Sequence, residues 1–453
     1  MEKQDTPVTS LLAPPLSRAA SAERRILPNA AAVSVGSAAA KIAGALKVVV
    51  MARLFGAADT LDAFLIALLL PSFFADVVAG CLTPAMVPFL IERHGAARRI
   101  VREVLAGAVL LLCLIAVLVF IAGGWLLPVL GSNFSPSTLA LSRSLLPWLL
   151  LTLPLSACVA VWRAVLNASG AFALAATLPV LTPALTVLSL WLTPAGWGVM
   201  ILCSATVAGV AAEAFGLAVA VKRLGYPLLP RWPGWSSELS ALARRYFPLT
   251  AGGAVTSSGV VIDRSVAASL MPGSVSALSY GNRLVAVLLE LTSTALGTVM
   301  LPAFAHFVAA GDWDGLRRTA GRYAAWVLAA SVPATGLLVF CAEPMVRIVL
   351  ERGAFDRAAT QTVSAILQYS LLQLPFAALF ALGSRLAIAC GASGVLARVA
   401  LAACIVNVAG DVLLARWMGL PGIALAATIT QCAALVYLTF ELRRKEPRLL
   451  ATL

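Results

Sequence analysis

The chain has 453 residues, of which 61% are hydrophobic and only 12% are charged. A soluble globular protein carries about twice that share of charged residues, so no soluble core of this size hides so much apolar surface. The short alternating segments typical of a transmembrane β-barrel are absent from the sequence. The composition therefore predicts an all-α protein that crosses a membrane many times.

The first 28 residues are polar and include Arg18, Arg24 and Arg25. They lack a short apolar region followed by a cleavage site, which favours a cytoplasmic tail over a signal peptide. About twelve apolar runs follow, each long enough to span a bilayer as a helix. Their approximate centres are Leu46, Val77, Ala116, Leu155, Leu181, Val207, Val255, Leu291, Leu328, Leu372, Cys404 and Ala433.

The sequence repeats itself. The segment LPLSACVAVWRAVLNASG (Leu153 to Gly170) parallels LPFAALFALGSRLAIACG (Leu374 to Gly391). We expect two parallel six-helix repeats around a central cavity, an arrangement that permits alternating access. The predicted units are an N-terminal tail (1–28), a first bundle (29–224), a cytoplasmic connector containing a short interfacial helix (225–245), a second bundle (246–442) and a C-terminal tail (443–453).

The net charge of +13 is distributed unevenly between the loops. Basic clusters such as Arg98–Arg99 and Arg443–Arg444 fall in the tails and in alternate loops. This bias follows the positive-inside rule and predicts that both termini are cytoplasmic. The basicity therefore has a topological explanation, and no nucleic-acid partner is expected.

Some basic residues lie inside the apolar runs, where each costs about 2.5–3.5 kcal/mol on insertion scales. They are Lys41, Lys47, Arg163, Arg264, Arg283 and Arg385. Lys41 and Lys47 lie about 9 Å apart along a helix and about 120° around it, on one broad face. With Arg264 and Arg283 from the second bundle, they predict a cationic cavity that binds phosphate or diphosphate. The alternative is snorkelling to the headgroups, which suits Arg163, Arg385 and Lys47 best.

Oxygen-bearing side chains form a second pattern. Asn407 and Asp411 share one helical face, Thr428 follows in the last span, and Asp263 comes from the seventh. Such oxygens suit a hard cation, so Na⁺ or H⁺ is a candidate coupling ion, and no tightly bound cofactor is expected. Equally open is simple ion pairing, of Asp411 with Arg385 or Arg416 and of Asp263 with Arg264. Glu213 is a candidate partner for Arg163.

Three segments resemble a known family. ARLFGAADTLDAFLIALLLPSFF is similar to the first-to-second-helix region of lipid II flippases of the MurJ (MviN) type, which belong to the multidrug/oligosaccharidyl-lipid/polysaccharide exporter superfamily. GSVSALSYGNRL followed by ALGTVMLPAF resembles their eighth-helix segment, and LERGAFD resembles their loop before helix ten.

The resemblance implies a transporter and not an enzyme. It would move an undecaprenyl-diphosphate-linked glycan from the inner to the outer leaflet of the bacterial inner membrane, in peptidoglycan and cell-wall biogenesis. It assigns substrate contacts to Lys41, Lys47, Asp62 and Arg283, and a cation site to Asp263, Asn407, Asp411 and Thr428. Glycan polymerases are candidate partners. An exopolysaccharide or O-antigen unit remains an alternative substrate, as does, less favourably, a small molecule exported with cation coupling.

The chain departs from the family pattern at several of these positions. Lysines replace the usual arginines of the first helix, Ala75 and Asp76 replace an arginine pair in the second, and Val48 replaces an acid. The family also carries two further C-terminal helices. Because of these differences, the resemblance fits a peptidoglycan precursor and another lipid-linked repeat unit equally well as the substrate.

Overall fold

The computed structural model describes residues 16–192, 198–232, 234 and 236–445, and within these ranges every regular element is helical. The helices before residue 237 are α1 (Leu16–Phe55), α2 (Asp59–Phe74), η2 (Ala75–Gly80), α3 (Cys81–Glu92), η3 (His94–Ala96), α4 (Ala97–Leu130), α5 (Pro136–Leu150), α6 (Thr152–Ala168), α7 (Phe172–Thr177), η4 (Leu178–Val180), α8 (Leu181–Leu192) and α9 (Gly198–Arg223). Those that follow are α10 (Ser237–Ala268), α11 (Ser274–Ala310), α12 (Trp313–Phe340), α13 (Ala342–Leu350), α14 (Arg357–Leu371), α15 (Leu374–Ala389), α16 (Ser393–Met418) and α17 (Leu420–Lys445).

Nine helical segments in the described residues are long and apolar enough to cross a membrane, and the bent pair α14–α15 makes a tenth. The expected all-α polytopic fold is confirmed. The sequence predicted about twelve spans, and the difference lies in α10 and α11. Both are long helices, of 32 and 37 residues. Helix α10 falls below the apolar criterion, since it carries Asp263 and Arg264 among several serines, threonines and glycines.

Polar side chains set the starts of several helices. At the N-termini of α5, α10, α12 and α14, a side-chain oxygen accepts a hydrogen bond from a backbone N–H of the first turn. Such caps satisfy donors that the helix itself leaves unpaired. The capping residues are Ser135, Ser236, Asp312 and Asp356. Glycines with positive φ, Gly273 and Gly311, flank α11 and let the chain turn sharply at both ends.

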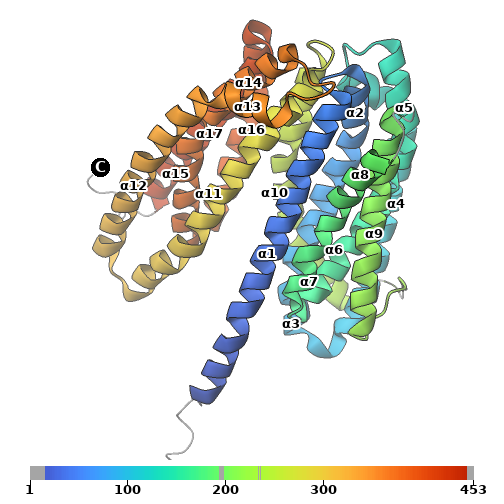
Figure 1. The fold of residues 1–453 in the computed structure, drawn as a ribbon. Coiled ribbons are helices and arrows are strands. Elements are labelled where there is room, and N and C mark those ends of the chain that lie inside the picture. Colours follow the sequence, from blue (N-terminus) through green and yellow to red (C-terminus); the bar gives the residue numbers. More distant parts are fainter. Residues whose placement is uncertain (1–15, 193–197, 233, 235, 446–453) are drawn as a thin grey trace, which may run out of the picture.

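Two groups of helices stand side by side, and α10 lies between them (Figure 1). In the first group, α1 packs on α7 and α8, while α6 packs on α4 and α9. In the second group, α11 packs on α14 and α15, and α16 packs along α17. Helix α10 contacts α2, α3 and α4 on one side and α16 on the other. Helix α10 therefore connects the two groups along the bundle.

The two groups are also joined at one end of the molecule, called here the closed end, where α1 finishes and α2 and α11 begin. The N–H of Ala354, in the loop before α14, donates to the carbonyl of Arg53 at 2.8 Å. The hydroxyl of Tyr280 on α11 donates to the carbonyl of Gly56 at 3.0 Å. A side chain at Gly56 would meet the carbonyl of Ala354, so this close approach requires glycine.

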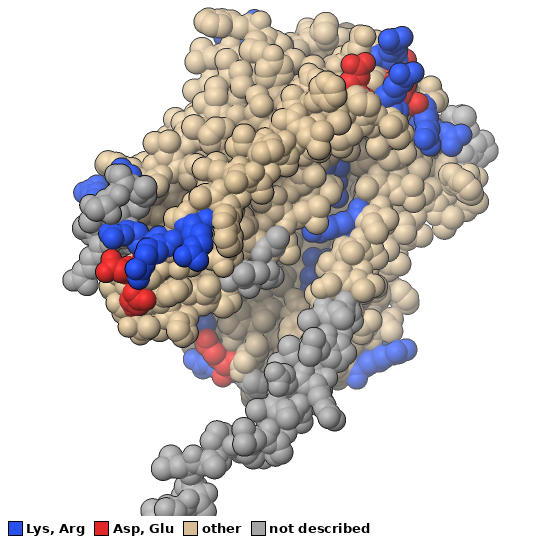
Figure 2. All heavy atoms as spheres, turned by 60° about the vertical axis from the view of Figure 1, so that its left-hand side comes forward, with Lys and Arg blue, Asp and Glu red and all other residues tan. Residues whose placement is uncertain are grey.

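At the opposite end, called the open end, the groups diverge. Helix α1 runs away from α11 and α12 toward this end (Figure 1). In Figure 2 the surface between the groups is hollowed, and basic side chains lie inside the hollow, while most of the remaining surface in this view carries no charge. An uncharged outer surface with charged groups inside a hollow is the pattern expected of a helical bundle in lipid.

Helix α1 begins at Leu16, within the segment expected to form the N-terminal tail. One local expectation was wrong in detail. The short interfacial helix expected in the connector is not separate, because residues 237–245 are the first turns of α10. The capping hydroxyl of Ser236 also donates to Glu103 on α4, and Arg99 donates to the same carboxylate at 2.7 Å. These contacts fasten the start of α10 to the first group of helices.

Candidate functional site

The predicted basic residues Lys41, Lys47 and Arg283 come together where α1 faces α11, and Glu290 of α11 lies beside them. These four residues are called here the basic wall. The ammonium of Lys41 lies 3.0 Å from a carboxylate oxygen of Glu290, and the two side chains remain 43% and 44% exposed. Two half-exposed groups of this kind form a weak ion pair that a stronger ligand can displace. Glu290 was not among the site residues predicted from the sequence.

Arg283 lies directly against α1. A Cβ atom at Gly44 would come within 2.9 Å of its terminal nitrogen Nη2, so the guanidinium occupies the space that this glycine leaves free. Gly44 stands between Lys41 and Lys47 in the sequence of α1. Arg283 is close enough to Lys47 for the two cations to repel each other. The wall thus holds three cations and one carboxylate within a short length of two facing helices.

The missed residue had a detectable signal. Glu290 follows Arg283 by seven residues, which is about two turns of helix, so both project from the same face of α11. If the side chain of Arg283 faces the cavity, the side chain of Glu290 is expected to face it too. Helical spacing was applied to the cations of α1 but not to the acid of α11.

Asp62, assigned by the resemblance to substrate contact, is fully buried at the start of α2. Its two carboxylate oxygens accept hydrogen bonds from the backbone N–H groups of Ser276 (2.7 Å) and Val275 (3.3 Å). A carboxylate at a helix N-terminus is stabilised by these unpaired donors and by the helix dipole. This position supports a role in fastening α11 to α2 at the closed end.

Arg264 on α10 lies near acids rather than in the basic wall. It interacts electrostatically with its neighbour Asp263 and with Asp76. Asp76 lies in η2, a π-helical turn that interrupts α2 and α3 and that the sequence did not predict. A cation balanced by two carboxylates offers less attraction to an anionic substrate than Arg283, which forms no ion pair within the described part of the chain.

Three of the four predicted cation ligands gather between α10 and α16. Asp263 lies close enough to Asn407 and Asp411 to interact with both side chains. The carboxamide oxygen of Asn407 lies 3.2 Å from the Cβ position of Gly259, so α10 and α16 are in close contact here. Thr428 on α17 makes its hydrogen bond elsewhere, donating to the carbonyl of Tyr369 at 2.9 Å.

This acidic cluster (Asp263, Asn407 and Asp411) holds buried oxygens without hydrogen-bond donors. Asp411 is fully buried, and neither of its carboxylate oxygens has a partner among the described residues. One oxygen of Asp263 is in the same condition. Two adjacent buried carboxylates are costly unless a proton or a cation joins them. The donors of the cluster are carboxylate and carboxamide oxygens, a set that suits a hard cation.

The alternative pairings can now be compared with the geometry. Arg163 pairs with Glu213 as expected, and Thr182 donates to the same carboxylate at 3.3 Å. The alternative partner of Asp411, Arg385, lies instead against Gly297 on α11. Arg264, the arginine that the sequence offered for Asp263, does interact with it electrostatically, so the acidic cluster is neutralised only in part and only on the side of Asp263.

A helical bundle that crosses the membrane many times, is closed at one end and is hollow with basic groups inside at the other has the architecture of a membrane transporter. The family model described as "Lipid II flippase MurJ" matches residues 51–452. The chain belongs to this family, whose members are transporters and not enzymes.

Curated relatives agree with this assignment. A probable lipid II flippase MurJ of Vibrio cholerae serotype O1 is 28% identical over 373 residues, which cover 78% of this chain and 71% of the relative. Another, from Thermotoga maritima, is 26% identical over 422 residues and covers 91% and 84% of the two chains.

Solved structures agree with the fold. One described as lipid II flippase MurJ in an inward closed conformation has a TM-score of 0.80 at 21% identity and covers 91% of this chain and 87% of its own. An inward-facing multidrug resistance MATE family transporter of the MOP superfamily has a TM-score of 0.73 at 14% identity, with 90% and 95% covered.

Proposed function

We propose that this protein is a flippase for an undecaprenyl-diphosphate-linked glycan of the lipid II type, which it moves from the inner to the outer leaflet of the bacterial inner membrane. The observation that carries the proposal is the basic wall. Lys41, Lys47 and Arg283 face one carboxylate, Glu290, so the wall keeps a formal charge of two positive units. A diphosphate diester carries about the opposite charge, and it would compete with Glu290 for Lys41.

The proposed mechanism is alternating access. With both termini in the cytoplasm, the open end faces the cytoplasm and admits the diphosphate and its sugars to the hollow. The hydrogen bonds of the closed end, between Ala354 and Arg53 and between Tyr280 and Gly56, must then break to release the headgroup outward. The lipid tail stays in the bilayer throughout, because hydrocarbon has no favourable place in a polar cavity.

We further propose that Na⁺ or H⁺ binds the acidic cluster and couples to transport. The support is the set of buried carboxylate oxygens without donors on Asp263 and Asp411. When bound, the cation would supply positive charge between the two carboxylates. Because they lie on α10 and α16, such binding would draw these helices together, and α10 also contacts the first group of helices. Ion binding would therefore bias the relation between the two groups.

The proposal is tested by translocation in liposomes that contain the purified full chain. A fluorescent undecaprenyl-diphosphate-linked sugar is placed in one leaflet, and its appearance in the other leaflet is followed by quenching. We expect protein-dependent translocation of the diphosphate-linked lipid and much less of the same lipid with a neutral headgroup. Equal translocation of both would overturn the proposal.

The glycan is tested separately by complementation. A bacterial strain depleted of its essential lipid II flippase is supplied with this chain, and growth and cell shape are measured. Growth supports lipid II as the substrate. Failure to grow, together with translocation in liposomes, would favour an exopolysaccharide or O-antigen unit on the same lipid. A glycan polymerase that consumes the translocated unit is the partner we expect. An exporter of lipophilic cations is disfavoured by the positive charge of the wall.

A further inference from the structure

Arg385 is a cation that belongs neither to the basic wall nor to the acidic cluster. Arg385, near the end of α15, places its guanidinium over Gly297 of α11. A Cβ atom at Gly297 would lie 2.9 Å from Nη2 and 3.3 Å from both Cζ and Nε. Three guanidinium atoms at such similar distances mean that the group lies flat against the helix. Arg283 also reaches over a glycine of a neighbouring helix, Gly44, although there only Nη2 approaches the Cβ position, at 2.9 Å.

No carboxylate of the described residues lies within ion-pair distance of Arg385, and its buried Nε has no hydrogen-bond partner among them. A guanidinium in a membrane-spanning segment is costly, and such groups usually face a partner or a water-filled cavity. By contrast, Arg163 on α6 has Glu213 for a partner. Arg385 therefore has the properties of a cation that awaits an anion from outside the protein.

Helical spacing places Arg385 on the cavity side of α11. Gly297 follows Glu290 by seven residues, as Glu290 follows Arg283, so all three positions share one face of this helix. Each step of seven residues is about 10.5 Å along the axis. The guanidinium of Arg385 thus lies one such step beyond the Lys41–Glu290 pair, on the side of the open end.

The residue before Arg385, Ser384, lines a partly polar cavity of about 190 Å³ between α11, α15 and α17, together with Thr292, Ser293 and Gln431. The hydroxyls of Ser384 and Thr292 donate to backbone carbonyls, so they offer acceptors to sugar hydroxyls, and the carboxamide of Gln431 can both donate and accept. A sugar that follows the diphosphate would therefore find polar groups in this cavity.

We propose that Arg385, lying over Gly297, is a second anion-binding site, which receives the diphosphate of the lipid-linked glycan before it reaches the basic wall. This assignment rests on the proposed function. The guanidinium fork suits bidentate binding of a phosphate, and its place nearer the open end means that an entering headgroup meets it before the Lys41–Glu290 pair.

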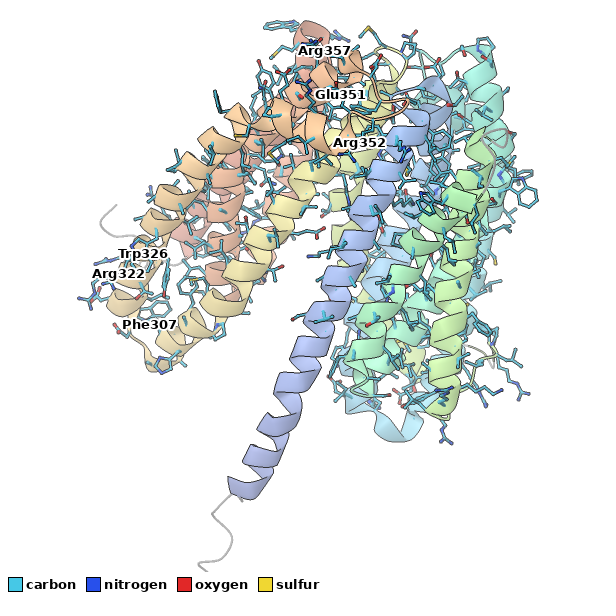
Figure 3. All side chains as sticks on the ribbon, in the orientation of Figure 1. Phe307, Arg322, Trp326, Glu351, Arg352 and Arg357 are labelled. Atoms are coloured by element: carbon cyan, nitrogen blue, oxygen red, sulfur yellow. The ribbon has the colours of Figure 1, made fainter. Side chains whose placement is uncertain are left out.

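The test uses the full chain in nanodiscs of zwitterionic lipid and measures binding of undecaprenyl diphosphate and, separately, of inorganic pyrophosphate. Arg385→Gln removes the charge, and Gly297→Ala keeps it but displaces the guanidinium. Losing a hydrogen bond to a charged group raises the dissociation constant for undecaprenyl diphosphate about tenfold. We expect this weakening in both variants. Arg322→Gln is the matched control, because Arg322 is exposed at the start of α12, far from α1 (Figure 3).

The outcomes separate this proposal from the proposed function. If the unmodified protein and both variants bind undecaprenyl diphosphate equally, Arg385 is not a substrate site, while the flippase assignment stands. Arg385-dependent binding of inorganic pyrophosphate without binding of the lipid would indicate a site for a free phosphate compound and also overturn the proposal. If the unmodified protein binds neither probe, both proposals fail together. Should Arg385→Gln fold poorly, Gly297→Ala alone decides, since it retains every charge.

Discussion

The basic wall and the acidic cluster both hold charged side chains on membrane-spanning helices, but they differ in how far these side chains are exposed to water. In the wall, Lys41 and Glu290 remain nearly half exposed, and Arg283 lies in a space opened by a glycine. In the cluster, Asp411 is fully buried, and its oxygens have no donors among the described residues. The Lys41–Glu290 pair of the wall is open to water, whereas Asp411 of the cluster is shielded from it.

This difference in hydration indicates different ligands. Cations that are open to water on facing helices are accessible to a large anion, which displaces their water when it binds and whose opposite charge offsets the cost of that desolvation. Buried carboxylates have already lost their water, so a small cation or a proton is needed to stabilise them. A bulky lipid headgroup fits the wall, and a bare ion fits the cluster.

The strongest way to break this comparison is to reverse a charge in the wall. Arg283→Glu or Lys41→Glu would place a carboxylate opposite the diphosphate and, for Lys41, beside Glu290. Like-charge contacts cost several kcal/mol, so we expect translocation to fall about a hundredfold or more. The liposome assay measures this fall, with membrane insertion checked in the same preparation.

The double variant Lys41→Glu/Glu290→Lys is the control for that reversal. It restores both the ion pair and the net charge of the wall, so translocation is expected to recover in part. No loss in either single variant, in protein that inserts normally, would mean that the wall does not contact substrate.

The acidic cluster is tested by Asp411→Asn. Removing one of two adjacent buried carboxylates relieves their repulsion, so the variant is expected to be at least as stable as the unmodified protein without Na⁺. A ligand that binds only the folded state raises the melting temperature, so Na⁺ should stabilise the unmodified protein but not the variant. Thermal unfolding in sodium and in choline salts measures the difference.

Asp314→Asn is the matched control for the cluster, because Asp314 lies at the exposed start of α12 with its side chain 77% exposed. It should leave the response to Na⁺ unchanged. If the unmodified protein shows no such response, sodium is excluded, and the proton remains the candidate ion.

Gly44→Ala sharpens the account of the wall without changing any charge. The added methyl group would meet Nη2 of Arg283 at 2.9 Å and push the guanidinium away from α1. Losing one charge-assisted contact predicts about a tenfold weaker affinity for the diphosphate lipid. Gly124→Ala, at a glycine of α4 with open space around it, should leave affinity unchanged. Equal affinity in both variants would contradict the placement of Arg283.

Asp62 extends the comparison to a buried carboxylate that is fully satisfied. Asp62→Ala would leave the N–H groups of Val275 and Ser276 without their acceptor, and we expect a loss of about 1–3 kcal/mol in stability. Thermal unfolding checks this, with Asp59→Ala at the same helix start as the control. A stability loss confined to Asp59→Ala would contradict the role assigned to Asp62.

Particular residues show how far sequence reasoning reached. The apolar runs predicted the all-α fold, and the spacing of Asn407 and Asp411 predicted one face of α16. The same reasoning paired Arg163 with Glu213 correctly. It failed for Glu290 and Arg385, because their neighbours belong to helices far away in the sequence, and it could not anticipate the π-helical turn that carries Asp76.

The sequence alone determined that this protein spans a membrane with helices and that some of its charged side chains face away from lipid. Both conclusions rest on hydrophobicity and helical period, which are local properties of the chain. Only the tertiary structure decided which charges meet. Lys41 pairs with Glu290, whereas Arg385 lies over a glycine with no ion pair among the described residues. Which of these occurs depends on how helices cross that are far apart in the sequence. Such contacts are set by packing, and no local pattern encodes them.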